Sequence, residues 1–242
     1  RTGLPGAVMA HLEGRHGGTG GNELRAGVLG ASDGLTSNLS LVMGVAGADL
    51  GARTVFLTGF AGLLAGALSM AIGEWLSVQS ARELCEHQVD VERQELNEVP
   101  EEEEEELALI YQAKGLDEQT ARKVAGDLIR SGGSALDTLV REELGIDPKE
   151  LGGSAWVASL TSFALFAAGA ILPVLPFAWG EGTTAIAASL LLSVVGLFVI
   201  GAGVALTTGV ALPRAAGRQI VLGLIASAIT FGLGRLFGGV LG

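Results

Sequence analysis

The chain has 242 residues, of which 49% are hydrophobic and only 5% aromatic, with 38 glycines and a mean hydropathy of +0.49. This composition is too apolar and too rich in small residues for an ordinary soluble domain, and it favours a membrane protein. The net charge of −11 argues against a nucleic-acid partner, because contact with phosphates requires a positively charged face. Cations are the partners that such a charge favours.

Five apolar segments are long enough to form transmembrane helices, since a helix needs about 20 residues to cross the hydrocarbon layer. A tail over residues 1–23 precedes them, and an acidic segment over residues 81–150 separates the second from the third. The first two helices then occupy residues 24–80 and the last three residues 151–242. The sequence predicts an all-α membrane protein with an inserted helical domain. The five predicted helices cover residues 24–48, 54–78, 155–176, 184–207 and 218–241.

The segment over residues 81–150 carries most of the charge of the chain. It holds 20 of the 26 acidic residues and 8 of the 15 basic ones, so its net charge is about −12 and the rest of the chain carries about +1. Within it, Glu98 is followed by an unbroken run of glutamates over residues 101–106. An acidic, water-exposed module is therefore inserted between apolar halves.

This module is predicted to form three or four short helices. Asn97 and Pro100 interrupt two runs of strong helix formers, Asp117 is a suitable N-cap for the next helix, and Gly145 ends the last one. No helix breaker lies between Gly73 and Asn97, so we expect the second transmembrane helix to continue into the module.

Lysines and arginines at the helix ends predict the orientation, because basic loops stay in the cytoplasm. The loop between the first two helices has Arg53 alone, and residues 172–184 contain no basic residue. These loops are expected outside, which places the N-terminus and the acidic module in the cytoplasm and the C-terminus outside. We expect a multi-pass protein of the cell membrane, surrounded by lipid. The basic residues at the opposite helix ends are Arg25, Arg82, Lys149, Arg214 and Arg218.

Asp33 is the strongest candidate for a functional residue inside the membrane, because an ionisable group there is costly unless it faces a partner or a water-filled path. Ser37 and Ser40 share its helical face, with Asn38 beside them. The alternative is a helix cap at the membrane edge. On the second helix, Met70 and Glu74 are four residues apart and offer a thioether and a carboxylate to one point, although packing alone would also explain a methionine there.

Carboxylates three residues apart on a helix project side by side, as in the pairs Glu92 with Glu95 and Glu103 with Glu106. Each pair is suited to hold a divalent cation, which would also relieve the repulsion between the glutamates. A second acidic patch includes Glu143. The alternative is a solvated face without a metal. No HExxH, P-loop, GxSxG or EF-hand pattern occurs, so the sequence predicts no enzyme.

The strings SDGLTSNLSLVMGVAGA, GALSMAIGEWLSVQS and LPVLPF, together with the acidic insert, resemble the vacuolar iron transporter family and its bacterial relatives. The resemblance runs from about Leu24 to the C-terminus. It implies a five-helix homodimer that exchanges protons for Fe²⁺, and sometimes Mn²⁺, Co²⁺ or Zn²⁺, with a cytosolic metal-binding domain. The membrane aspartate and methionine of the family match Asp33 and Met70. Its metal-binding glutamates match Glu92, Glu95, Glu103, Glu106 and Glu143.

The chain departs from the family pattern at two places. Leu139 and Val140 stand where relatives carry two methionines, and Gly62 stands where they carry a membrane glutamate. Soft ligands are therefore missing from the module. Glu74 is the nearest replacement for the lost membrane charge.

Together these features predict a homodimeric, proton-coupled divalent metal transporter that exports Fe²⁺ or Mn²⁺ from the cytosol. In this interpretation Asp33, Met70 and Glu74 form the membrane path, and the glutamate module captures the ion. Proton coupling follows because protons and metal compete for the same carboxylates. The alternatives are a membrane-anchored metal buffer or sensor without transport, and a structural membrane protein with a solvated acidic insert.

Overall fold

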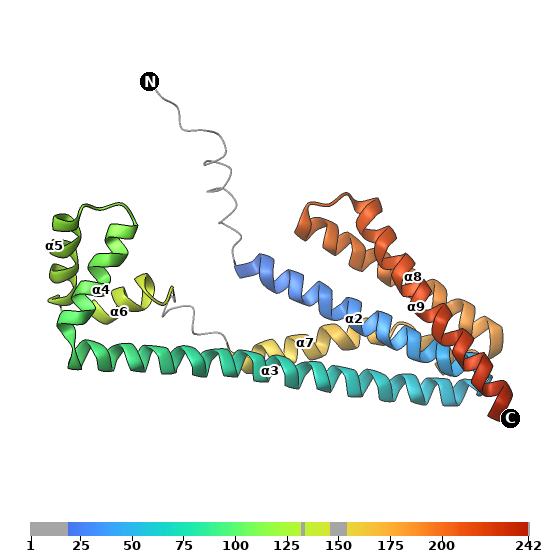
Figure 1. The fold of residues 1–242 in the computed structure, drawn as a ribbon. Coiled ribbons are helices and arrows are strands. Elements are labelled where there is room, and N and C mark those ends of the chain that lie inside the picture. Colours follow the sequence, from blue (N-terminus) through green and yellow to red (C-terminus); the bar gives the residue numbers. More distant parts are fainter. Residues whose placement is uncertain (1–18, 132–133, 146–153, 242) are drawn as a thin grey trace, which may run out of the picture. The chain divides into compact units, whose positions relative to one another are not determined.

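The computed structural model describes residues 19–131, 134–145 and 154–241 (Figure 1). This part of the chain is helical and contains no strand, which confirms the predicted all-α class. Most of the predicted tail over residues 1–23 lies outside the described residues. The helices are α2 Thr19–Gly47, α3 Ala52–Glu98, α4 Pro100–Ala113, α5 Glu118–Ile129, α6 Ala135–Glu142, α7 Ala155–Ala170, α8 Gly182–Thr208 and α9 Leu212–Leu241, with a 3₁₀ turn, η2, at Leu175–Ala178.

Three of the described helices, α3, α8 and α9, are long and apolar enough to cross a membrane. The helix α7 is apolar but has only 16 residues. It was predicted to reach residue 176, but it ends at Ala170, because Pro173 and Pro176 have no N–H group to continue the helical hydrogen bonds. The helix α2 has 29 residues, but polar side chains such as Asp33 and Asn38 interrupt its apolar sequence. Five membrane spans thus remain a prediction.

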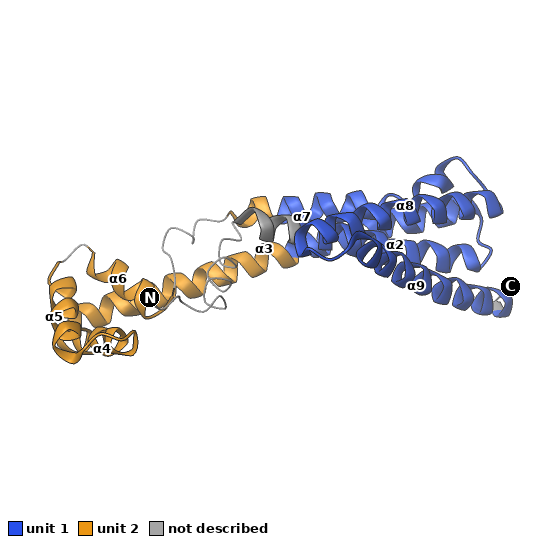
Figure 2. Ribbon diagram, turned by 90° about the horizontal axis from the view of Figure 1, so that it is seen from above, with its two compact units in different colours: residues 1–72, 159–242 blue, residues 73–158 orange. Residues whose placement is uncertain are grey.

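The chain divides into two compact units (Figure 2). Unit 1 comprises residues 1–72 and 159–242, and unit 2 comprises residues 73–158. The helix α3 is continuous and contributes to both, as expected from the absence of a breaker before Asn97.

In unit 1, α2 packs against α8 and α9. Glycines allow helices of this unit to approach closely, because an added Cβ would collide with a backbone carbonyl: that of Phe166 on α7 at Gly34 of α2, and that of Gly44 on α2 at Gly234 of α9. Small residues at membrane-helix contacts let backbones approach in this way. The largest fully buried side chains in this unit include Leu35 and Leu39 of α2.

Polar side chains inside unit 1 join the helices through hydrogen bonds to backbone carbonyls. The Nδ2 atom of Asn38 donates to the carbonyl of Gly59 on α3, at 3.1 Å, and to that of Ala170, at 2.6 Å. Ala170 is the last residue of α7, where carbonyls lack a helical partner, so Asn38 caps this helix. Ser159 donates to the carbonyl of Ala71 at 2.8 Å.

Unit 2 packs α4, α5 and α6 around a small apolar core that contains Leu107, Ala108, Ala125 and Leu139. The predicted break is confirmed, because α3 ends at Glu98 and α4 begins at Pro100. A proline suits the first position of a helix, since the N–H that it lacks would have no helical acceptor there. Asp117 caps α5 as predicted, by accepting a hydrogen bond from the backbone N–H of Thr120 at 3.1 Å. These boundaries set the positions of the glutamates.

Candidate metal centre

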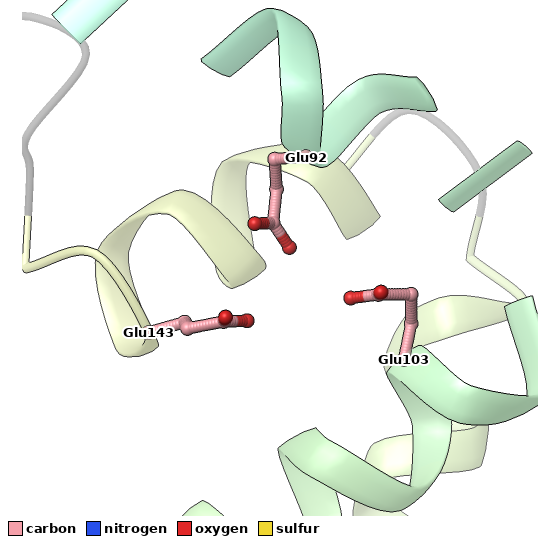
Figure 3. Close-up of side chains that lie close together, drawn as sticks. All are labelled: Glu92, Glu103 and Glu143. Carbon is pink, nitrogen blue, oxygen red and sulfur yellow. The ribbon is translucent and has the colours of Figure 1, made fainter. Parts of the chain in front are cut away.

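Three glutamates from three different helical segments converge in unit 2 (Figure 3). Glu92 lies on α3, Glu103 on the first turn of α4, and Glu143 caps the C-terminal end of α6. One carboxylate oxygen from each residue lies within 4.8 Å of the others. Figure 3 shows the three side chains pointing toward one another across the space between their helices. Oxygens gathered in this way suit a hard or borderline divalent cation.

Two of these carboxylates are buried, and each of the two has one oxygen atom without a hydrogen-bond partner in the described part of the chain. The exposed fraction is 3% for Glu92 and 5% for Glu103, whereas Glu143 is exposed. Atoms Oε1 of Glu92 and Oε2 of Glu103 are buried and have no hydrogen-bond partner among the described residues. A buried charged oxygen without a partner is costly, and a bound cation or a proton removes that cost.

The cluster holds protons more tightly than isolated glutamates do. Burial raises the pKa of Glu92 to about 8, with further increases from the charges of Glu143 and Glu103. Burial also raises the pKa of Glu103. The pKa of Glu143 is raised by burial first and then by the charges of Glu106 and Glu95. Protons and a metal ion would therefore compete at this centre around neutral pH.

The glutamate run over residues 101–106 is divided by the helical period. Only Glu103 is directed into the cluster, while Glu104 lies 4.0 Å from Arg130 and Glu105 lies 3.8 Å from Arg122. The two arginines belong to α5 and its C-cap, and they offset charge on the outer face of α4. These pairs were not predicted from the sequence. Their spacing of eight residues on one helix was the available signal.

Of the five predicted metal-binding glutamates, the structure brings Glu92, Glu103 and Glu143 together. Glu95 and Glu106 are exposed and act on the cluster through their charge. The glutamates that meet therefore come from three helical segments, whereas the sequence suggested pairs within single helices.

The donor set of the cluster consists of oxygen atoms. Leu139 and Val140, at the positions where the family pattern has methionines, are fully buried in unit 2, with exposed fractions of 0% and 1%. Leu139 packs against Leu107 and Ala125 in the apolar core. Residues 81–150 contain no methionine, so the thioether ligands of the family pattern have no substitute here. Such a site favours hard and borderline ions over soft ones.

In unit 1, Asp33 and Ser37 lie on the outer surface of α2. Met70 approaches the same helix from α3, because a Cβ added at Gly30 would lie 3.3 Å from its Cε and 3.7 Å from its Sδ. Gly30 and Asp33 are three residues apart and share a helical face. Gly30 is buried, whereas Asp33 is exposed, so Met70 contacts α2 one turn before the carboxylate of the predicted path. Glu74, one turn further along α3, is half-buried and belongs to unit 2.

The side chains of Leu41 and Asn38 occupy the space next to Gly62, so the glutamate of the family pattern would require them to move. A Cβ at this position would lie 2.9 Å from Oδ1 of Asn38 and would collide with Leu41. The Oδ1 atom of Asn38 is buried and has no hydrogen-bond partner among the described residues. Asn38, which the sequence placed only beside the polar stripe, therefore takes the space next to Gly62.

Comparison with known proteins agrees with these features. Residues 24–235 match the profile of the VIT family. A vacuolar iron transporter of Acanthamoeba castellanii is 38% identical over 214 residues, which cover 88% of this chain and 78% of that protein. Vacuolar iron transporter 1 of Arabidopsis thaliana is 31% identical over 222 residues, covering 90% of this chain and 87% of the relative. The match extends over most of both chains, and this chain belongs to the VIT family.

Proposed function

We propose that this chain is a proton-coupled divalent metal transporter that exports Fe²⁺ or Mn²⁺ from the cytosol. The observation that carries the proposal is the convergence of Glu92, Glu103 and Glu143, two of which are buried with one carboxylate oxygen each that has no hydrogen-bond partner among the described residues. Relatives at up to 38% identity are named iron transporters, which supports iron as a cargo. The oxygen-only donor set supports Mn²⁺ as a second cargo. Co²⁺ and Zn²⁺ are further ions that such a site can bind.

In this proposal, unit 2 is the cytoplasmic domain that captures the ion. At neutral pH a cation must displace the proton of Glu92, whose pKa is raised to about 8 by burial and by the neighbouring carboxylates. Capture is therefore favoured where protons are scarce. The same competition at a membrane carboxylate would couple metal movement to an opposite movement of protons.

Asp33, Met70 and Glu74 are proposed to line the membrane path. An exposed carboxylate on a lipid-facing helix surface is costly, so the outer face of α2 needs a cover. A second copy of the chain, related by two-fold symmetry, would cover Asp33 with the same face and build the path between the two protomers. The proposed homodimer follows from this requirement.

A metal buffer or sensor remains the second candidate, because the glutamate cluster would serve it equally well. The buffer needs only an anchor in the membrane. The exposed Asp33 favours transport, since an anchor has no use for a carboxylate on an apolar helix.

Metal flux into proteoliposomes with an imposed pH gradient tests the proposal. Wild-type protein should move Mn²⁺ and Fe²⁺ in a direction that reverses with the gradient. Replacing Glu92, Glu95, Glu103, Glu106 and Glu143 together by Gln should slow this flux and leave it dependent on the gradient. A buffer would instead retain metal in proportion to protein, would ignore the gradient, and would lose all retention in the five-Gln variant.

A further inference from the structure

Two pockets with a common wall lie at the end of unit 1 where α3 begins. The first is a cavity of about 340 Å³. It lies between the first turns of α3, with Arg53 and Phe56, and a segment that runs from Phe177 of η2 to Glu181. The second, of about 500 Å³, lies against α8. Trp179 and Gly180 line both pockets, so the pockets adjoin at the indole ring.

The first pocket presents one positive and one negative side chain. Arg53 and Glu181 are both exposed, and neither forms an ion pair with another described residue. In the first turn of α3, the N–H groups of Thr54 and Val55 donate to the carbonyl of Gly51. The Arg53 guanidinium is therefore the group of this pocket that attracts an anion. A ligand that carries a phosphate and an ammonium group would match both charges. A bare metal cation would be repelled by Arg53.

The second pocket is almost entirely apolar. Its walls are Leu175 and Pro176 on one side and the α8 residues Thr184, Ala188 and Leu192 on the other. From Thr184 to Leu192 the helix rises by about 12 Å, at about 1.5 Å per residue. The groove therefore follows an apolar, membrane-spanning helix away from the charged pocket, as a fatty acyl chain follows from a lipid headgroup.

Trp179 joins the two environments. Its exposed fraction is 85%, which is high for a large aromatic side chain, and tryptophan is favoured at the boundary between lipid headgroups and hydrocarbon. A soluble zwitterion would occupy the charged pocket and leave both the apolar groove and the indole ring uncovered. A phospholipid would cover the charged pocket, the apolar groove and the indole ring.

We propose that these pockets bind one zwitterionic phospholipid. Its phosphate lies at Arg53 in the first turn of α3, its ammonium group lies at Glu181, and one acyl chain lies along α8 past Ala188. The site binds phosphatidylethanolamine in preference to phosphatidylglycerol, because the latter carries no positive group for Glu181.

Native mass spectrometry of the full chain, equilibrated in nanodiscs of equal phosphatidylethanolamine and phosphatidylglycerol, tests the site. Wild-type protein should retain one phosphatidylethanolamine per chain with at least a fivefold preference. Arg53→Ala should lose it and Arg53→Lys should keep most of it, whereas Glu181→Gln should move the preference toward phosphatidylglycerol. Ala188→Trp, which fills the groove without changing charge, should abolish retention. Asp49→Asn, an exposed acidic residue of the same end that lines neither pocket, is the matched control and should behave as wild type.

Gel filtration and melting curves identify any variant that does not fold. Equal retention of the two lipids by wild type, unchanged in Arg53→Ala and Glu181→Gln, would mean non-specific lipid contact and overturn the proposal. Displacement of the lipid by water-soluble glycerophosphoethanolamine at matched concentration, with no effect of Ala188→Trp, would reduce the site to a soluble zwitterion pocket and also overturn it.

Discussion

Metal binding to the glutamate cluster should release close to one proton per ion at pH 7. A carboxyl group with a pKa of about 8, as in Glu92, is about nine-tenths protonated at that pH, and the metal requires the carboxylate. The apparent dissociation constant should therefore rise about fivefold from pH 8 to pH 7 and about ninefold more from pH 7 to pH 6, because half of the Glu92 carboxyl groups are already protonated at pH 8. From pH 8 to pH 6 this is about fiftyfold.

The raised pKa of Glu92 also determines how the stability of the metal-free protein changes with pH. The folded state holds a proton on Glu92 up to pH of about 8, whereas the unfolded chain releases it near the ordinary value of 4.5. The free energy of unfolding should therefore fall as the pH rises from 4.5 toward 8, by at most about 3 kcal/mol at pH 7. Unit 2 should melt at a higher temperature at pH 5 than at pH 7.5, and added metal should remove the difference by binding the folded form.

Titration calorimetry with Mn²⁺ in buffers of different ionisation enthalpy measures the released protons directly. The full chain in detergent is compared with a variant in which Glu92, Glu103 and Glu143 are all Gln, so that any ion bound in the membrane part is subtracted. An observed enthalpy that does not depend on the buffer, with an affinity that is flat from pH 6 to pH 8, would refute proton competition at this cluster.

Three further predictions concern unit 1. Asp33→Ala should abolish metal flux in a folded protein, and full flux in proteoliposomes would remove this carboxylate from the path. Met70→Ala should slow Fe²⁺ and Co²⁺ more than Mn²⁺, because only the softer ions gain from a thioether; equal losses in a flux assay would indicate packing instead. Gly234→Ala should lower the melting temperature by several degrees, at a cost of about 1–3 kcal/mol, because the new Cβ meets the carbonyl of Gly44. Gly232→Ala on the same helix meets nothing within 4 Å and should be neutral or slightly stabilising, so similar losses in both variants would contradict the packing argument.

Local sequence patterns were sufficient to predict the all-α class and several helix boundaries, whereas the last helix begins at Leu212 and not at residue 218. Uninterrupted apolar or helix-forming runs predicted α3, α8 and α9, and the breakers Asn97 and Pro100 predicted the end of one helix and the start of the next. These features depend on local chemistry, such as a missing N–H or a capping carboxylate, and local chemistry is written in neighbouring residues. The motifs on the first two helices also identified the family.

Only the tertiary structure decided which glutamates meet. Spacing along a helix proposes neighbours three or four residues apart, but Glu92, Glu103 and Glu143 come from three segments whose packing around Leu107 and Leu139 brings them together. The same packing turned Glu104 and Glu105 toward arginines of another helix. A sequence pattern shows which residues share one face of a helix. Which faces meet depends on contacts between residues far apart in the chain. Those contacts also bury Glu92, and this burial raises its pKa.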